Sequence, residues 1–401
     1  MQANQPFQIL GLLLLVLGFF VACTEPYAFE NESYEDILVV DGMLTNQIKK
    51  HQLYLARSYA FGAQSLPEKG AMVRVVDQEG NGVAYREKAD FVYEATQPFG
   101  AQAGKEYHVE ITTAAGKNYR SRAMRLPEIA TIEGVTASAA NNDLDEAGIR
   151  IAIDAQSASN DSRLYRLEYE ETYKVVAPFW TPYDAVVVFE GYSTFETAVI
   201  LRETEERVCY ALNKSNKIML RSTANQTLDR IDQEEVVFLS TQDAKLIHRY
   251  SVLVRLLVEQ PETYNYFNTL KELSAQSVNF FSAVQPGYLT GNLFNPTNEA
   301  EKVAGFFRVS AADEARIFIN LNDYYPDAEE PPYFRSCGFQ APLAEGTRGN
   351  RSLLNIIYRG WMRFYDYNRG EMPGGPYLMV PASCGDCTVL GSNKKPEFWI
   401  P

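Results

Sequence analysis

Short segments in which apolar and polar residues alternate follow one another through residues 37–125. In KEYHVEI, for example, Tyr107, Val109 and Ile111 share one face of an expected strand, and polar residues occupy most of the other face. Breaks that contain Gly, Asp or Asn separate several of these segments, as in compact antiparallel folds. The pattern predicts an Ig-like or transthyretin-like β-sandwich over residues 37–128.

The alternation continues past Gly134 and predicts a larger β-rich domain over residues 129–401. One segment changes period. Pro261 suits the first position of a helix, and the residues after it form an apolar stripe with helical spacing: Tyr266, Phe267, Leu270 and Leu273. We therefore expect a mostly β chain with one conspicuous helix, at about residues 261–281, inserted in the second domain.

The N-terminus carries an uninterrupted run of apolar residues and glycine from Ile9 to Ala22. As a helix this run is roughly 21 Å long, which is shorter than the roughly 30 Å hydrocarbon core of a bilayer. Its length is typical of a secretory signal, and a cysteine follows it directly. The Phe20–Cys23 segment resembles the bacterial lipobox. We interpret residues 1–22 as a lipoprotein signal peptide and Cys23 as the lipidation site. An ordinary cleaved signal with an incidental cysteine is the alternative.

Residues 23–36 contain acidic side chains and no Lys or Arg, which predicts a solvated acidic tether. The whole chain has a net charge of −14, and this surface charge repels phosphate backbones. We therefore expect no nucleic-acid partner. The expected contact with a membrane is made through the N-terminal lipid, because two or three acyl chains anchor a protein stably.

The chain has five cysteines, and four remain when Cys23 is set aside: Cys209, Cys337, Cys384 and Cys387. In an oxidising envelope an even number of cysteines predicts two disulfides, with three possible pairings. Cys384 and Cys387 have the CxxC spacing of redox motifs, but the strand-to-helix context of a thioredoxin-like site is missing around them. A zinc site is the weakest alternative, because no second CxxC accompanies the first.

Several segments, taken in order, resemble a Bacteroidetes outer-membrane lipoprotein family that is catalogued only as a domain of unknown function. They are ILVVDGMLTN, GAMVRVVDQEG, GKEYHVEITTAAGKNYRS, VCYALNKSNKIMLRST, GNLFNPTNEAEKVAGFFRVS and the final CGDC with KPEFW. Genes of that family commonly lie beside one for a TonB-dependent receptor. The resemblance therefore implies an accessory lipoprotein at the outer membrane. The cell surface is the expected side, and the periplasmic leaflet is the alternative. The resemblance supplies no catalytic residues.

A search of the sequence for catalytic motifs likewise identifies no catalytic residue. The three histidines, His51, His108 and His248, belong to no HExxH, GxSxG or Walker-type motif. We expect no catalytic residue, no cofactor and no metal site. A carboxylate-dependent hydrolase stays open as a minor alternative, because acidic residues are abundant.

Two aromatic, proline-containing stretches are the candidate binding loops. Their residues are Phe179, Trp180, Tyr183 and Tyr192 in the first stretch and Tyr324, Tyr325, Tyr333 and Phe334 in the second. Exposed aromatic side chains on loops are common binding hot spots. The alternative is that these side chains fold back as lids on the core.

We expect a lipid-anchored accessory protein that helps a TonB-dependent receptor to capture a ligand. An envelope scaffold or adhesin is the second hypothesis.

Overall fold

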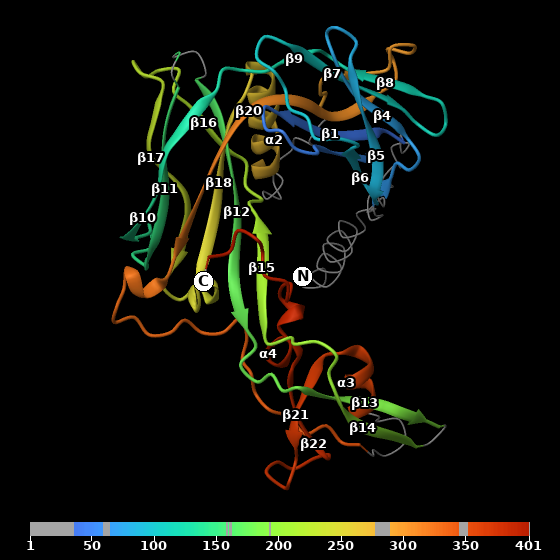
Figure 1. The fold of residues 1–401 in the computed structure, drawn as a ribbon, viewed down its shortest axis with the longest axis vertical. Helices are drawn as coiled ribbons and strands as arrows, with labels where there is room; N and C mark the ends of the chain where they lie inside the picture. The colour runs from blue at the N-terminus through green and yellow to red at the C-terminus, as the bar shows by residue number, and fades with distance from the viewer. Residues whose placement is uncertain are drawn as a thin grey trace, which may run out of the picture.

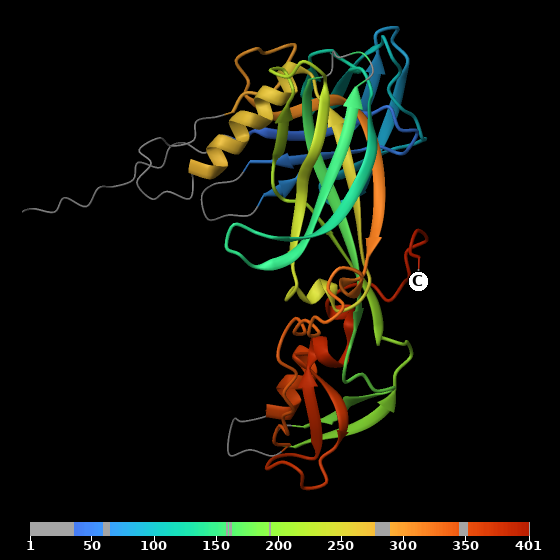
Figure 2. The same cartoon turned by 90° about the vertical axis from the view of Figure 1, so that its left-hand side faces the viewer.

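The computed structural model describes residues 36–58, 65–157, 159, 163–191, 194–276, 289–344 and 352–400. The chain is mostly β, with several sheets and few helices, as predicted from the alternation. The expected helix is confirmed as α2 (Pro261–Gln276), and its predicted end near residue 281 lies outside the described residues. The molecule is elongated, and a small lower lobe occupies one end of its long axis (Figures 1 and 2).

The largest sheet has fifteen strands and falls into two halves. The N-terminal half also contains one short strand from late in the chain, and its strands are β1 (Leu38–Thr45), β2 (Gln52–Arg57), β3 (Leu66–Pro67), β4 (Met72–Asp77), β5 (Gly82–Ala89), β6 (Val92–Ala95), β7 (Glu106–Thr112), β8 (Asn118–Ser121), β9 (Met124–Arg125) and β19 (Leu293–Phe294). The predicted face of β7 is buried, since Tyr107, Val109 and Ile111 are each 6% exposed or less. This half curls back on itself, because Thr290, just before β19, bridges to Ala304.

The second half of the large sheet contains β12 (Leu164–Val176), β15 (Val208–Lys214), β16 (Met219–Ser222), β18 (Tyr250–Val258) and β20 (Val303–Ile319). The two halves join where β1 pairs with β20 in parallel, so the sheet continues across the predicted domain boundary at residue 128. At that join Gly305 lies opposite Val40 with φ of 96°. An added Cβ on Gly305 would lie 1.8 Å from the carbonyl oxygen of Val40, so the close pairing requires glycine.

A three-stranded sheet packs on one face of β12, β18 and β20 to form what we call the sandwich. Its strands are β10 (Ala130–Asn141), β11 (Ala147–Ser157) and β17 (Arg230–Ser240). The alternation of β18 places five residues inward, and each is 1% exposed or less: Tyr250, Val252, Val254, Leu256 and Val258. The central β11 contributes Ile149, Ile151 and Ile153 to the same core. Apolar burial therefore holds these two sheets together.

The opposite face of β12, β18 and β20 carries ion pairs. Arg255 of β18 lies between Glu314 of β20, at 2.5 Å, and Glu168 of β12, at 3.3 Å. Deeper in, Arg166 donates to the fully buried carboxylate of Glu259 at 2.9 Å. The helix α2 covers this end of the face.

The ring of Phe267 on α2 lies under two arginines. Its centroid is 4.4 Å from the guanidinium carbon of Arg166 and 5.1 Å from that of Arg308. A neighbouring ring, Tyr266, packs 4.7 Å from Phe306 of β20. The apolar stripe predicted on this helix therefore packs partly on cations, through cation–π contacts.

The lower lobe, as we call it, combines two segments that are far apart in the sequence (Figure 1). Its elements are β13 (Tyr183–Glu190), β14 (Phe195–Leu201), α3 (Ser352–Arg359), β21 (Met362–Tyr367), β22 (Tyr377–Pro381) and α4 (Ala382–Gly385). The strands form two separate two-stranded sheets around a small core that includes Leu353, Phe364 and Met379. Three short 3-10 helices complete the described elements: η1 (Ala244–Leu246), η2 (Leu321–Asp323) and η3 (Cys387–Val389).

Two disulfides hold this lobe, as the even cysteine count predicts. Cys337 pairs with Cys384 inside the lobe, and Cys209 of β15 pairs with Cys387 at the junction with the large sheet. The two cysteines of the CxxC segment therefore bind different partners instead of each other. The pairing ties the C-terminal segment both to the lobe and to the sandwich.

Candidate functional site

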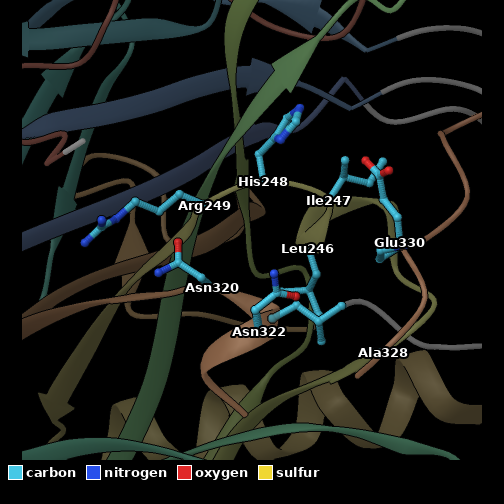
Figure 3. Close-up of a pocket in the computed structure, with 10 residues that line it drawn as sticks. Leu246, Ile247, His248, Arg249, Asn320, Asn322, Ala328 and Glu330 are labelled. Carbon is cyan, nitrogen blue, oxygen red and sulfur yellow. The ribbon is translucent and has the colours of Figure 1, made fainter. Parts of the chain in front are cut away.

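A cleft of about 520 Å³ lies at the end of the sandwich nearest the lower lobe. One wall is the entry to β18 and the other is the chain that follows β20, and ten residues line them: Leu246, Ile247, His248, Arg249, Asn320, Leu321, Asn322, Ala328, Glu330 and Pro331. Arg249 and Asn320 lie together on one side, while Ile247 and Glu330 lie on the other (Figure 3). The residues that line the cleft therefore include a cation, an anion and two amides.

His248 is the titratable ring in this cleft. Burial lowers the pKa of His248 below its usual value, the nearby charge of Lys174 lowers it further, and Glu330 opposes both. The imidazole is therefore neutral at pH 7, with one nitrogen that donates and one that accepts. The guanidinium carbon of Arg249 lies 5.1 Å from the ring centroid of Phe318. This cation–π contact holds the guanidinium group against the ring.

The second wall is held in place by hydrogen bonds. Asn320 donates its side-chain amide to Asp323 at 2.9 Å across η2. The hydroxyl of Tyr325 reaches the β10–β11 hairpin, where it donates to the carbonyl of Gly148 at 2.9 Å. Ordered hydrogen bonds of this kind keep the wall in one arrangement, as a preformed binding site requires.

The second aromatic stretch backs this wall. Tyr324, Tyr325, Tyr333 and Phe334 are all half-buried and pack against the sandwich core. Phe334 stacks on Tyr173 of β12 at 5.7 Å between centroids, and the Tyr333 hydroxyl donates to the Ser383 carbonyl at 2.7 Å. These four rings therefore support the wall of the cleft from behind, and they are not among the residues that line it.

The first aromatic stretch is divided between core, strand and surface. Phe179 packs edge-on against Phe339 and Tyr365, and Trp180 packs against the sandwich core. Tyr183, expected on a loop, begins strand β13 and is 47% exposed. Tyr192 lies outside the described residues.

The two aromatic stretches meet at the backbone of α4. The amide of Phe179 donates to the Cys384 carbonyl at 2.9 Å, next to the Ser383 carbonyl that Tyr333 contacts. The structure therefore brings both predicted loops to the joint between sandwich and lower lobe.

The buried carboxylate of Glu171 is connected to the cleft through Lys245, which precedes the lining residue Leu246 in the chain. Glu171 of β12 pairs with Lys245 at 2.7 Å, one residue before the cleft residue Leu246. Tyr250 donates to its other oxygen at 2.8 Å, and Asn213 donates at 3.2 Å. These contacts hold the Glu171 carboxylate in place, and its ion pair with Lys245 positions η1.

The other two histidines lie in the N-terminal half of the large sheet. His51 is buried, and its Nε2 donates to the carbonyls of Phe99 and Gln47. Burial, with help from the charge of Lys49, lowers the pKa of His51 to about 4. His108 lines a smaller cleft of about 290 Å³ and lies 3.3 Å from Glu110.

Sequence reasoning placed His248 just before a strand but did not find the cleft. Its lining joins residues around positions 246–249 and 320–331, which come together only through the pairing of β18 with β20. The polar cluster Asn320 and Asn322, at the end of a long alternating strand, is the local signal that was missed.

Cys23 lies outside the described residues. Within the described residues, no helix has both the length and the apolar character needed to cross a bilayer. The same parts of the chain contain no group of three or more His, Cys, Asp or Glu side chains arranged to hold a metal ion.

Comparison with curated proteins finds no match. Among solved structures, the chain is similar to a DUF4785 family protein from Legionella pneumophila, with 9% identity and a TM-score of 0.18. That similarity covers 54% of this chain and 51% of the Legionella chain, so the chain spans about half the length of this relative. The model of a family described as a domain of unknown function, DUF4249, matches residues 24–316, which is more than half of the chain. The chain therefore belongs to the DUF4249 family.

Proposed function

We propose that this chain is a non-catalytic accessory protein of the outer membrane, which binds a ligand and works with a TonB-dependent receptor. In this proposal the lipid on Cys23 anchors the chain, and the acidic residues 24–36 separate the folded part from the bilayer. The signal-like N-terminus, the cysteine that follows it and the family resemblance support this placement. Exposure at the cell surface is part of the proposal.

The observation that carries the proposal is the cleft beside His248. A cleft of about 520 Å³ is large enough for a small ligand, and its walls are held by hydrogen bonds before any ligand arrives. The lining offers a cation at Arg249, an anion at Glu330 and amides at Asn320 and Asn322. This lining suits a polar ligand that carries several hydrogen-bonding groups.

The mechanism requires only differential binding. A rigid, polar cleft holds the ligand near the receptor, which raises its local concentration there. The neutral imidazole of His248 donates or accepts a hydrogen bond without adding charge. The energy for transport comes from the receptor, so the accessory protein needs no catalytic step.

Affinity purification from native outer membranes in mild detergent tests the association. Mass spectrometry identifies the proteins that accompany the tagged chain and reads the intact mass of the chain itself. We expect one TonB-dependent receptor in near-equal amount and a chain that begins at an acylated Cys23. Recovery of the chain alone, repeatedly and in several detergents, would contradict the association and favour a scaffold or adhesin.

A Cys23→Ala variant is the matched control for the anchor. It is expected to lose the acyl mass and to leave the membrane fraction, because the acyl chains supply the membrane affinity. A chain that keeps residues 1–22, or that stays on the membrane without lipid, would contradict the proposed anchor.

A further inference from the structure

The sheet formed by β13 and β14, which we call the ribbon, exposes an unusual amount of apolar surface. Val188 is 58% exposed, Phe189 52%, Ile200 46% and Leu201 66%. One side of the ribbon packs on the lower-lobe core through Ala185, Phe195 and Val199. By the strand register, Val188 and Phe189 lie near Glu196 at one end of the ribbon, and Ile200 and Leu201 lie at the other end. The ribbon therefore exposes apolar side chains at both ends, and exposed apolar surface is a common feature of interaction sites.

The free edge of the ribbon is β14. In the described parts of the chain β14 pairs only with β13, while β13 also contacts β21 and α3 of the lower lobe. The sequence of β14 is FETAVIL, which has high β propensity and contains no Lys, Arg or Pro. Natural proteins usually protect an exposed edge strand with Lys, Pro, a bulge or a covering element. The one bulge of the ribbon lies on β13, near Val188, and leaves β14 regular.

The charges of the ribbon have one sign. Its two strands contain Asp184, Glu190 and Glu196 and no Lys or Arg. Asp184 lies 3.6 Å from Arg202, and Glu190 accepts a hydrogen bond from Tyr358 at 2.8 Å. Glu196 is exposed on β14 itself, opposite Phe189 of the neighbouring strand. A strand that pairs with β14 therefore meets an acidic residue within an apolar row.

We propose that β14 accepts an extended segment of a second protein as an added strand. The segment alternates apolar residues with polar ones, and it places a Lys or Arg opposite Glu196. Main-chain hydrogen bonds along the edge give affinity, and the apolar row with its single acid sets register and specificity. A second copy of this chain is a poor occupant, because it would bring the same acids to the interface.

The inference rests on the proposed function, since it gives the accessory protein the edge by which it docks on its receptor. Site-specific photo-crosslinking in native cells tests it, with p-benzoylphenylalanine in place of Ile200 and, separately, Val188. Met72, which is 68% exposed on β4, is the matched control position far from the lower lobe. Tandem mass spectrometry then maps the crosslinked peptide.

We expect positions 200 and 188, and not position 72, to crosslink to one extended apolar segment that contains Lys or Arg. Glu196→Lys should lower that yield about fivefold, because a cross-strand attraction becomes a repulsion. Glu196 is exposed, so this variant keeps the melting temperature of the unchanged protein. Equal yields at positions 200 and 72, an adduct with a second copy, an adduct on a helix or an acidic segment, or a yield unchanged by Glu196→Lys would each overturn the inference.

The two proposals fail in different ways. If the purified complex contains a TonB-dependent receptor but ribbon crosslinks do not map to it, the docking edge is wrong and the receptor association stands. If the ribbon crosslinks to a basic, apolar strand of a protein that is not such a receptor, the edge stands and the receptor association is wrong. Absence of both the receptor and the crosslink overturns both.

Discussion

The sandwich and the lower lobe are stabilised by different interactions. The sandwich buries whole strand faces, and its second face carries ion pairs such as Arg166–Glu259. The lower lobe has a small core, two separate two-stranded sheets and two disulfides. Small cores bury too little apolar area to be stable alone, and disulfides compensate. The lobe can therefore leave apolar strand surface exposed, which the sandwich does not do.

Among variants that still fold, the largest expected effect is in the sandwich, at its buried ion pair. Glu259→Ala removes the fully buried carboxylate that pairs with Arg166 and leaves Arg166 with Glu168 alone. It also removes the acceptor of Ser310, which donates to the same carboxylate at 2.6 Å. Breaking a buried ion pair costs about 4 kcal/mol, and the Glu168 that Arg166 keeps is nearer to solvent than Glu259, so the free energy of unfolding in urea should fall by about that amount. The matched exposed pair is Lys69–Asp90, and Asp90→Ala should change stability far less. Similar losses for the two variants would contradict the account.

The next effect concerns the join between the two halves of the large sheet. Gly305→Ala places a Cβ against the Val40 carbonyl and should lower the free energy of unfolding by about 3 kcal/mol. Gly80→Ala is the control, because Gly80 has a similar φ of 88° but no atom within 4 Å of an added Cβ. Its cost should be only that of the backbone conformation, about 1 kcal/mol. If both variants lose the same stability, the close approach at the join is not important.

A third prediction uses pH. The folded pKa of His51, about 4, lies below the usual 6.5 because burial disfavours the charged ring. The unfolded chain then binds more protons than the folded chain in acid, so His51 stabilises fully above pH 6.5 and loses this contribution as pH falls toward 4. Between about pH 7.5 and pH 4.5 this contribution should fall by about 2.5 kcal/mol.

His51→Gln keeps an N–H donor and removes the titration. The acid-dependent loss of stability in chemical unfolding should therefore be smaller in this variant than in the unchanged protein, by the amount given above. Parallel pH profiles for the two proteins would mean that His51 is not held neutral by the fold.

The smallest effect is expected in the ribbon. Ile200→Lys changes an exposed side chain and should alter the free energy of unfolding by less than about 0.5 kcal/mol. Ile149→Lys, in the sandwich core, should prevent folding, because it buries a charge without a partner. A large loss from Ile200→Lys would show that the ribbon belongs to the core of the lobe and would remove the contrast between the two regions.

Local patterns predicted local structure well. The inward row of β18 and the start of α2 at Pro261 follow from alternation and from the change of period. Contacts between distant segments did not follow, because register and pairing depend on the whole chain. The parallel pairing of β1 with β20, the disulfide partners and the cleft at His248 all belong to this second kind. The predicted boundary between domains at residue 128 and the lipid on Cys23 stay predictions.

The exposure of the candidate binding residues was equally hard to predict, because it also depends on contacts between distant segments. Aromatic content marked Trp180 and Tyr325 as surface candidates, but tertiary packing turns both toward the core. Val188, in a stretch that the sequence predicted to be a surface loop at least in part, lies on an exposed strand instead. Ile200, just beyond that stretch, lies exposed on the neighbouring strand. Composition locates side chains that bind well, whereas only the fold decides which of them reach solvent.

Amide hydrogen exchange at β14 tests the central contrast most directly. Exchange into β14 peptides is measured for the purified protein and for the same protein in isolated native outer membranes, with β18 peptides as the internal reference. The account predicts fast exchange at the outward amides of β14 in the purified protein, strong protection of those amides in native membranes, and β18 protected in both. Equal exchange into β14 in the two samples would contradict the claim that a partner strand covers this edge.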